Sequence, residues 1–485
     1  MPMIKQIRYR LIVTAFFATL WMLFFGTWLE WGQFNRADEY RILAPFPEWN
    51  KRLPLTLSAY LADHFGFRGS LITVNGLLRA KLLHTSTSPK VVFGKQGFLF
   101  YAGDQSMESY NGSRAITDCD IDSWVLLLER RQAWLATKGI PLIVLLAPDK
   151  QTVYPELMPD GIHHATPTSA DRWVAAIRRT HVPLIDMRPI EIAGKERRRV
   201  FHKTDTHWDP WGAYLAYREL LNEVARISPP LAEKIGPPAD PMTLKIDFKI
   251  LNGDMNRLLG LSILPGERAQ DFLPPHPIPI RADDAVIDGG TGNPKQPRML
   301  MFRDSFASAM APFLAPHFDH IFGTAIPSFD VDLVKKEHPD LVVVELVERH
   351  LNFAVPIDPD NTLNVSDPKA VFPGLWGVID EPFNGEVLHG PKIRSSGWAL
   401  ANDDNSIEKI QFMLDGHSVA DMRIHLPHAG VAKAQPGQKD SANAGVQYDW
   451  DSRSVPNGMH RLVWKATDSA GRTAEIGHRQ FCVAN

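Results

Sequence analysis

The sequence predicts an α/β protein with a parallel sheet, preceded by a transmembrane helix and followed by a β-sandwich. Three observations indicate this fold class. An apolar run near the N-terminus is about 20 residues long, which suffices to cross a bilayer. Strand and helix patterns alternate from residue 92 to residue 348. Short alternating runs with turn pairs follow residue 375. The length of 485 residues fits about three domains.

Charge and cysteine content exclude several classes of protein. The net charge is -3, whereas a nucleic-acid binder normally carries a basic face. Cys119 and Cys482 lack the spacing of a metal site. They either form a disulfide in an oxidising compartment or stay free. We find no Gly-rich phosphate loop, and we predict neither a cofactor nor a metal.

The N-terminus favours an uncleaved anchor. MPMIKQIRYR carries Lys5, Arg8 and Arg10, and the apolar run Leu11–Trp31 has no charge until Glu30. A basic flank of this kind stays in the cytoplasm. A cleavable signal peptide is the alternative, but its apolar core would be shorter and would end in small residues. We expect residues 1–34 to be a cytoplasmic stub and a single-pass inner-membrane anchor, with the bulk of the chain in the periplasm.

Residues 35–90 are predicted to be a helical connecting segment. LSAYLADHFGFRGSLITVNGLLRAKLL has two helical pieces with a break near Gly66. Asp63, His64 and Arg68 lie at this break. Their expected role is a cluster of hydrogen bonds at a helix end, in preference to catalysis.

Residues 91–355 are predicted to form the main domain. VVFGKQGFLFY indicates a hairpin, and PLIVLLAP is a continuous apolar strand of the kind that is buried on both faces. Asp209 and Pro210 suit the start of a helix. Repeated strand–helix–strand units imply a parallel sheet covered on both faces. The expected helices are 120–139, 169–181 (with Ser169 as cap), 211–227, 305–315 and 330–338; the strands are 141–148, 182–187, 297–304, 320–324 and 341–348; a loop-rich insertion occupies 229–296.

Three residues on two loops suggest nucleophilic catalysis. In FHKTDTHWDPWGAY, Asp205 and His207 are two positions apart, so in an extended backbone they point the same way. Ser305 follows a predicted strand and opens a helix, at the sheet edge where open α/β folds bind ligands. A nucleophile, a base and its orienting carboxylate are the parts of a serine triad. In the alternative, Asp205 and His207 bind a metal with His202 or Asp209.

Four further residues are candidates for contacts with the substrate or an oxyanion. Lys150 and Tyr154 follow the strand LIVLLAP, and Arg349 follows LVVVELVE. Arg303 lies two positions before Ser305. For each of them, surface charge or packing is the alternative role.

Several motifs in one order add a resemblance. NRADEYRILAPFP, DHFGFR, VVFGKQGFLFY, LLAPDKQTVYP, TDTHWDPWGA, FRDSFA and VVVELVERHL follow one another. Over about residues 35–355 the sequence resembles the alginate O-acetyltransferases of the AlgX and AlgJ kind, which have an SGNH-hydrolase-like three-layer domain. The resemblance implies that Ser305 is the nucleophile, His207 the base and Asp205 its orienter. Two positions depart from the family motif: Arg303 stands where Gly is usual, and Ala307 replaces the last serine.

The resemblance also implies a function. An SGNH-type serine O-acetyltransferase would move an acetyl group through an acyl-serine onto a hydroxyl of an exported polysaccharide. A multi-pass membrane O-acyltransferase would supply the acetyl group, and the anchor Leu11–Trp31 would hold the two proteins together. The alternatives are a carbohydrate acetylesterase with the same triad and a non-catalytic polysaccharide-binding assembly protein.

The C-terminal part differs from the rest in composition. Residues 356–374 are rich in Pro and Asp and are predicted to be a linker. Residues 375–485 show short alternating runs with turn pairs at Asp415-Gly416 and Asn457-Gly458, typical of an immunoglobulin-like β-sandwich. Family members often carry a carbohydrate-binding module here. Four tryptophans either form the core or stack on sugars, with the core preferred: Trp376, Trp398, Trp450 and Trp464.

Overall fold

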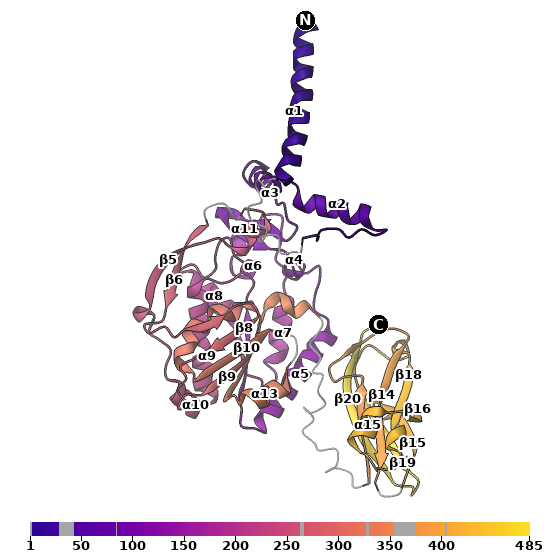
Figure 1. Cartoon of the computed structure of the whole chain (residues 1–485). Coiled ribbons are helices and arrows are strands. Elements are labelled where there is room, and N and C mark those ends of the chain that lie inside the picture. The colour runs from indigo at the N-terminus through magenta and orange to yellow at the C-terminus, as the bar shows by residue number, and fades with distance from the viewer. Residues whose placement is uncertain are drawn as a thin grey trace.

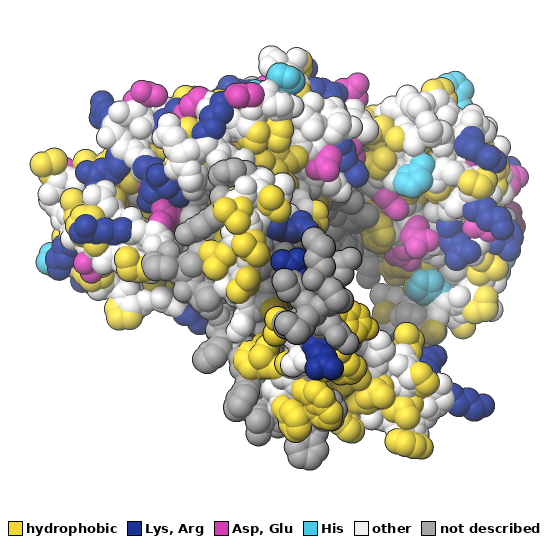
Figure 2. Space-filling model, turned by 90° about the horizontal axis from the view of Figure 1, so that it is seen from above, with side chains coloured by type: hydrophobic (Ala, Val, Ile, Leu, Met, Phe, Trp, Pro, Cys, Tyr) yellow, Lys and Arg dark blue, Asp and Glu magenta, His cyan; other side chains and the backbone are white. Residues whose placement is uncertain are grey.

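A computed structural model describes residues 2–28, 43–83, 85–261, 266–325, 329–353, 374–402 and 405–485. Its N-terminal part consists of helices that project from the main domain: α1 (Pro2–Trp28), α2 (Leu53–His64), α3 (Arg68–Leu78) and the π-helical turn η2 (Arg79–Leu83) (Figure 1). Figure 2 shows hydrophobic side chains gathered over these helices, in the lower part of the view.

The predicted anchor Leu11–Trp31 is not confirmed. Within the described ranges, none of the helices combines the length and the apolar character that a membrane span requires. The last residues of the predicted anchor, 29–31, lie outside the described residues.

The main sheet has seven strands in the order β4-β3-β11-β9-β10-β8-β7. The first five run parallel, whereas β8 is antiparallel to β10 and β7 is antiparallel to β8. Every residue of β3 and β11 is buried, which explains their continuous apolar runs. The strands are β3 (Leu142–Ala147), β4 (Leu184–Asp186), β7 (Ile280–Ala282), β8 (Val286–Gly289), β9 (Arg298–Arg303), β10 (His320–Ala325) and β11 (Leu341–Val347).

Helices cover both faces of this sheet, and each face has its own apolar core. On one face lie α8 (Met187–Lys195), α9 (Pro210–Ile227) and α12 (Ala311–Leu314); on the other lie α5 (Asp118–Ala136), α7 (Ser169–Ile177) and α13 (Val331–Glu337). Asp209 caps α9 as predicted. The caps of α5 and α7 are Thr117 and Thr168, each in a capping box, so the expected Ser169 cap is wrong.

The predicted hairpin is confirmed: β1 (Val91–Phe93) and β2 (Leu99–Tyr101) pair antiparallel around η3 (Lys95–Gly97). The insertion 229–296 is more regular than expected, because it contains a second hairpin and contributes β7 and β8 to the main sheet. The remaining elements of this domain are α4 (Ser106–Asn111), α6 (Lys150–Val153), η4 (Pro155–Leu157), α10 (Pro229–Ile235), η5 (Pro241–Thr243), β5 (Lys245–Leu251), α11 (Asp254–Leu258), β6 (Glu267–Leu273), η6 (Ser305–Ala309), η7 (Ala315–His317) and η8 (Glu348–Asn352).

The C-terminal part is β-rich and consists of two sheets around one apolar core. One sheet has the order β12-β14-β18-β17, and the other has the order β13-β20-β19-β15-β16. The strands are β12 (Leu375–Glu381), β13 (Val387–Leu388), β14 (Ile393–Ala401), β15 (Ile407–Leu414), β16 (His417–Asp421), β17 (Arg423–Leu426), β18 (Gly445–Trp450), β19 (Gly458–Asp468) and β20 (Thr473–Val483), with helix α15 (Ala429–Ala434) and turns η10 (Ser441–Asn443) and η11 (Ser452–Ser454).

The tryptophans of this part belong to the cores. Trp464 is fully buried, and Trp376 and Trp450 are each 8% exposed. Trp398 packs edge-on against Trp376, with ring centroids 5.0 Å apart. Packing therefore accounts for these four aromatic residues.

A disulfide between Cys119 and Cys482 joins the two parts of the chain. Cys119 lies in α5 and Cys482 in β20, and these two elements pack against each other beside the main domain (Figure 1). The sequence left this pairing open because the cysteines are 363 positions apart.

Candidate active site

Ser305 lies at the carboxyl edge of the main sheet. Strand β9 ends at Arg303, and Ser305 opens the 3-10 turn η6, with Asp304 as its cap. The Asp304 carboxylate accepts hydrogen bonds from the Phe306 amide at 2.9 Å and the Val347 amide at 2.6 Å. Ser305 is thereby fixed between the ends of β9 and β11. The helix expected over residues 305–315 is a 3-10 turn followed by the short α12.

The loop 201–209 is held against this turn. Phe201 pairs with Trp208 across the loop, and the Trp208 indole donates a hydrogen bond to the Phe306 carbonyl at 3.0 Å. The Phe306 ring packs against His207, with centroids 5.0 Å apart. These contacts bring His207 to Ser305, 98 positions away in the sequence.

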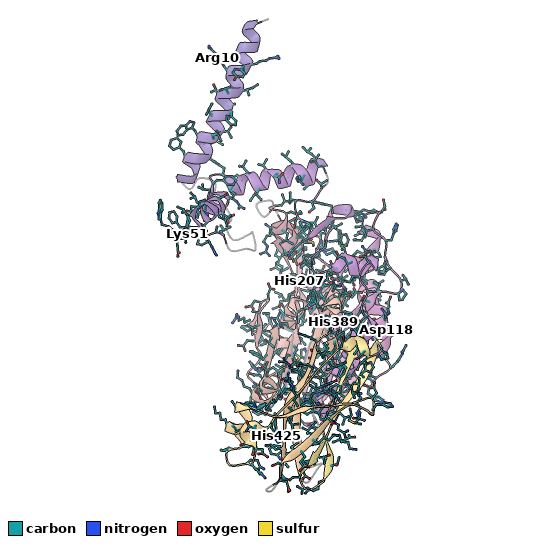
Figure 3. All side chains as sticks on the ribbon, turned by 90° about the vertical axis from the view of Figure 1, so that its right-hand side faces the viewer. Arg10, Lys51, Asp118, His207, His389 and His425 are labelled. Carbon is teal, nitrogen blue, oxygen red and sulfur yellow. A yellow bond between two sulfur atoms is a disulfide. The ribbon has the colours of Figure 1, made fainter. Side chains whose placement is uncertain are left out.

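Three predicted residues form one chain of hydrogen bonds. His207 Nε2 is 2.7 Å from Ser305 Oγ, and His207 Nδ1 is 2.7 Å from Asp205 Oδ1. Asp205 carries no donor when ionised, so Nδ1 holds the proton and donates it to Asp205. Nε2 is then free to accept the Ser305 proton. Figure 3 places His207 at the end of the main domain that faces the N-terminal helices.

The charges of this chain suit a proton acceptor. Burial lowers the pKa of His207, but the hydrogen bond and the negative charge of Asp205 act more strongly, so its pKa is raised above the usual range. Burial raises the pKa of Asp205, and the bonds from His207 and from backbone amides reverse this effect, so its pKa is lowered. The pair is thus an ionised carboxylate beside an imidazole of increased basicity.

Asp254 is a member of this site that sequence reasoning missed. Its amide donates to Asp205 Oδ2 at 3.0 Å, and its carboxylate accepts from the Thr206 amide at 2.8 Å. Burial and the charge of Asp205 raise the pKa of Asp254. No sequence pattern singled out Asp254. The structure shows that the chain passes close to the loop at the preceding residue, since a Cβ at Gly253 would lie 2.1 Å from the Thr204 carbonyl oxygen.

The metal alternative involves a different third residue from those named on sequence grounds. Asp209 caps α9 through its bonds to the Trp211 and Gly212 amides. Ligand atoms of Asp205, His207 and Asp254 lie within 4.8 Å of one another, a spacing that could hold an ion. In this site the same atoms already bond to each other and to backbone amides.

Lys150 and Tyr154 bond to backbone groups next to the site. The Lys150 ammonium is buried and donates to three carbonyl oxygens, those of Leu99, Lys203 and Asp205. Burial lowers its pKa to about 7. The Tyr154 hydroxyl accepts from the Val200 amide at 3.1 Å, and its ring is buried. Packing and backbone bonds engage both side chains, and their role as substrate contacts stays a prediction.

Arg303 braces the serine turn. Its guanidinium is fully buried and donates to the Asp304 carbonyl, to Ser308 Oγ at 3.1 Å and to the Asp283 carbonyl. An Arg in the position of the usual Gly thus ties η6 to the end of the insertion. These bonds do not lead toward His207.

Arg349 lies in the wall of the site. Its guanidinium donates to Asp149 at 2.6 Å and lies 5.5 Å from the ring centroid of Phe306 and 5.3 Å from that of Tyr101. Burial lowers its pKa, but the charge of Asp149 and the other nearby acids raises it above the usual value. Tyr101, at the end of β2, was not singled out from the sequence.

Comparisons with known proteins give the same assignment as the motifs. The family described as "SGNH hydrolase-like domain, acetyltransferase AlgX" matches residues 91–318. A probable alginate O-acetylase AlgJ from Pseudomonas syringae pv. tomato is 24% identical over 383 residues, which is 74% of this chain and 91% of that protein. The chain is similar to AlgX and AlgJ proteins in both comparisons. A probable alginate O-acetylase AlgJ from Pseudomonas aeruginosa is also 24% identical, over 64% of this chain and 83% of its own length.

Solved structures of AlgJ and AlgX align with the chain at low scores. The O-acetyltransferase domain of Pseudomonas putida AlgJ aligns with a TM-score of 0.35 and 21% identity, over 58% of this chain and 96% of that domain. Pseudomonas aeruginosa AlgX aligns with a TM-score of 0.38 and 14% identity, over 80% and 94%.

Proposed function

We propose that this protein is a serine O-acetyltransferase that acetylates a hydroxyl of an exported polysaccharide. The observation that carries the proposal is the chain of hydrogen bonds from Ser305 through His207 to Asp205, with both side-chain distances at 2.7 Å. This is the arrangement of a nucleophile, a general base and its orienter. The names of the similar proteins suggest that the transferred group is an acetyl group.

In the first half-reaction, Ser305 Oγ attacks the carbonyl carbon of a donor acetyl ester or thioester. His207 Nε2 takes the hydroxyl proton as the new bond forms. The tetrahedral oxyanion lies at the N-terminal end of η6, where backbone N–H groups of a first turn lack helical partners. The Phe306 amide is engaged by Asp304, so the amide of Ser305 itself is the donor that we assign.

Collapse of the tetrahedral intermediate returns His207 to its neutral form. When the intermediate collapses, the bond to the donor oxygen or sulfur breaks, and His207 gives its proton to that leaving group. An acetyl-serine remains. A sugar hydroxyl then attacks the acetyl carbon, His207 takes its proton, and the proton returns to Ser305 Oγ as the acetylated sugar leaves.

The partners and location follow from the family and belong to the same proposal. A multi-pass membrane O-acyltransferase would deliver the acetyl group to the periplasmic side, and Leu11–Trp31 would hold this protein at the inner membrane. The relatives are named for alginate. We propose an alginate-like exopolysaccharide as the acceptor.

The strand order of the C-terminal part supports our proposal that it is an immunoglobulin-like domain. Reading β12 to β20 in chain order, the two sheets follow the pattern A-B-E-D and A′-G-F-C-C′, with β13 parallel to β20. We propose that this domain spaces or holds the polymer beside α5.

The test compares the native protein with Ser305→Ala, His207→Ala and Ser308→Ala. Ser308 lies in the same turn but bonds to Arg303 and to the Asp283 carbonyl, so Ser308→Ala is the matched control. With an acetyl ester as donor and alginate as acceptor, we expect acetylated polymer from the native protein and from Ser308→Ala only. If all acetyl appears as free acetate, the protein is an esterase. If no variant changes the ester turnover, the catalytic proposal is wrong.

A further inference from the structure

An unusual amount of apolar surface is exposed in the connecting segment between α1 and the main domain. Ten large apolar side chains of residues 46–83 are at least 40% exposed: Phe46, Trp49, Leu55, Leu57, Leu61, Leu71, Val74, Leu78, Leu82 and Leu83. Contiguous apolar surface of this kind marks an interaction site. We call the segment of residues 46–83 the apolar collar.

Helix α3 is apolar on two sides, and only one of them is covered. Gly76 lies against Leu259 and Leu261 of the main domain, so close that a Cβ there would be 2.7 Å from the Leu259 carbonyl oxygen. The opposite side shows Leu71, Val74 and Leu78, which are three or four positions apart and share one face. One side of α3 therefore packs on the main domain, while its outer side is exposed.

Helix α2 has no buried residue at all within the described part of the chain. A helix of about 12 residues is marginal in water without a packed face. Leu55, Leu57 and Leu61 are all exposed and lie on more than one side of α2. A lipid environment would cover such a helix on several sides, whereas a single groove on a protein would cover only one side.

The charges of the collar favour one kind of medium. Among the collar side chains whose exposure the structure describes, the exposed cations are Lys51, Arg52 and Arg79, against the exposed anion Glu48. Basic side chains next to an apolar face suit anionic lipid headgroups. The collar also continues α1, because Gly26 of α1 packs on the Phe67 ring at the start of α3. Exposed residues of α1 such as Leu11, Phe17 and Trp21 extend the same apolar surface.

We propose that the apolar collar, residues 46–83, lies in the surface of a lipid bilayer that carries anionic headgroups. This contact is additional to any role of α1 and does not depend on the proposed reaction. The segment that packs on α3 also contains α11, whose Asp254 bonds to Asp205. The bilayer would thus fix the catalytic edge of the sheet near the membrane surface.

The test uses the full chain with a spin label on one introduced cysteine. The described cysteines are both in the disulfide, so the introduced thiol is the reactive one. Labels at Leu71→Cys and Leu78→Cys report on the collar. Val419→Cys is the matched control, because Val419 in β16 is also apolar and 53% exposed but lies in the C-terminal part. The protein is bound to vesicles of phosphatidylcholine with phosphatidylglycerol.

We measure collisions of each label with oxygen, which concentrates in lipid, and with a water-soluble nickel chelate. The expected result is a several-fold higher oxygen-to-nickel ratio at positions 71 and 78 than at 419. The proposal is overturned if all three labels show the ratio of an aqueous site. It is also overturned if positions 71 and 78 are shielded from both reagents, because a protein surface, such as a second copy, would then cover the collar.

Discussion

At the scale of single residues, the site depends on which nitrogen of His207 carries the proton. Asp205 accepts from His207 Nδ1 and also from the His207 and Asp254 amides, so its position is fixed by three donors. The chain pattern predicted the pair because residues two apart in an extended loop point the same way. It did not predict Asp254, because this residue lies in the long insertion, 49 positions from Asp205.

The first prediction concerns pH. His207 accepts a proton only when neutral, and its pKa is raised above the usual value of about 6.5. The kcat/KM for an acetyl ester should therefore be high at pH values above this raised pKa and should fall as the pH drops through it. Asp205→Asn removes the charge that raises the pKa, so the acid limb should move to lower pH, with a loss of roughly 10⁴-fold in rate. An unmoved limb would contradict this pairing.

A second prediction concerns Gly253. The Cβ of Gly253→Ala would lie 2.1 Å from the Thr204 carbonyl oxygen. Neither atom can rotate away, because the oxygen belongs to the backbone and a Cβ is fixed to it, so one backbone segment must move. Asp254 should then lose its bond to Asp205, and kcat/KM should fall about tenfold or more. Gly161→Ala is the control, because nothing lies within 4 Å of a Cβ there. Equal activity of the two variants would show that Asp254 does not position Asp205.

At the scale of elements, the loop 201–209 and the turn η6 act as one unit. The motifs on both were predicted, because each follows or precedes a regular element. The directions of side chains were not. Lys150 and Tyr154 follow β3 and Arg303 ends β9, yet their polar atoms bond to backbone carbonyls or amides. A position at a sheet edge does not decide whether a long side chain points into the site or away from it.

The third prediction tests the link between loop and turn. Trp208→Phe removes the indole bond to the Phe306 carbonyl, which should cost about 1 kcal/mol of stability and loosen the approach of His207 to Ser305. We expect lower kcat with little change in KM. Trp211→Phe is the matched control, because the Trp211 indole nitrogen has no hydrogen-bond partner in the described structure. Similar kinetics for both variants would argue against the link.

The fourth prediction concerns the contact of α5 with β20. Replacing both Cys119 and Cys482 by Ser should lower the free energy of unfolding by about 2–4 kcal/mol, since the disulfide closes a long loop of the unfolded chain. Denaturant unfolding measures the change. Turnover of an acetyl ester should be unaffected, because the disulfide lies outside the triad. Unchanged stability would mean that the packing of α5 and β20 alone holds the two parts together.

At the scale of the whole molecule, His207, which bonds to Ser305, lies in the part of the main domain nearest to the N-terminal helices (Figure 3). The parallel order of the central strands was predictable, since their apolar runs require burial on both faces. The antiparallel edge β8–β7 was not, because those short strands lie in a loop-rich insertion. The contact of α5 with the C-terminal part was not predictable either, since it joins distant segments through a single disulfide.

The most direct test of the central claim is the acyl-enzyme itself. The native protein is mixed with an acetyl ester without a sugar acceptor, quenched in acid and digested, and the peptides are analysed by mass spectrometry. We predict one acetyl group on Ser305, present in Ser308→Ala and missing from His207→Ala. Ester turnover without any label on Ser305, or with the acetyl group on another residue, would contradict the account.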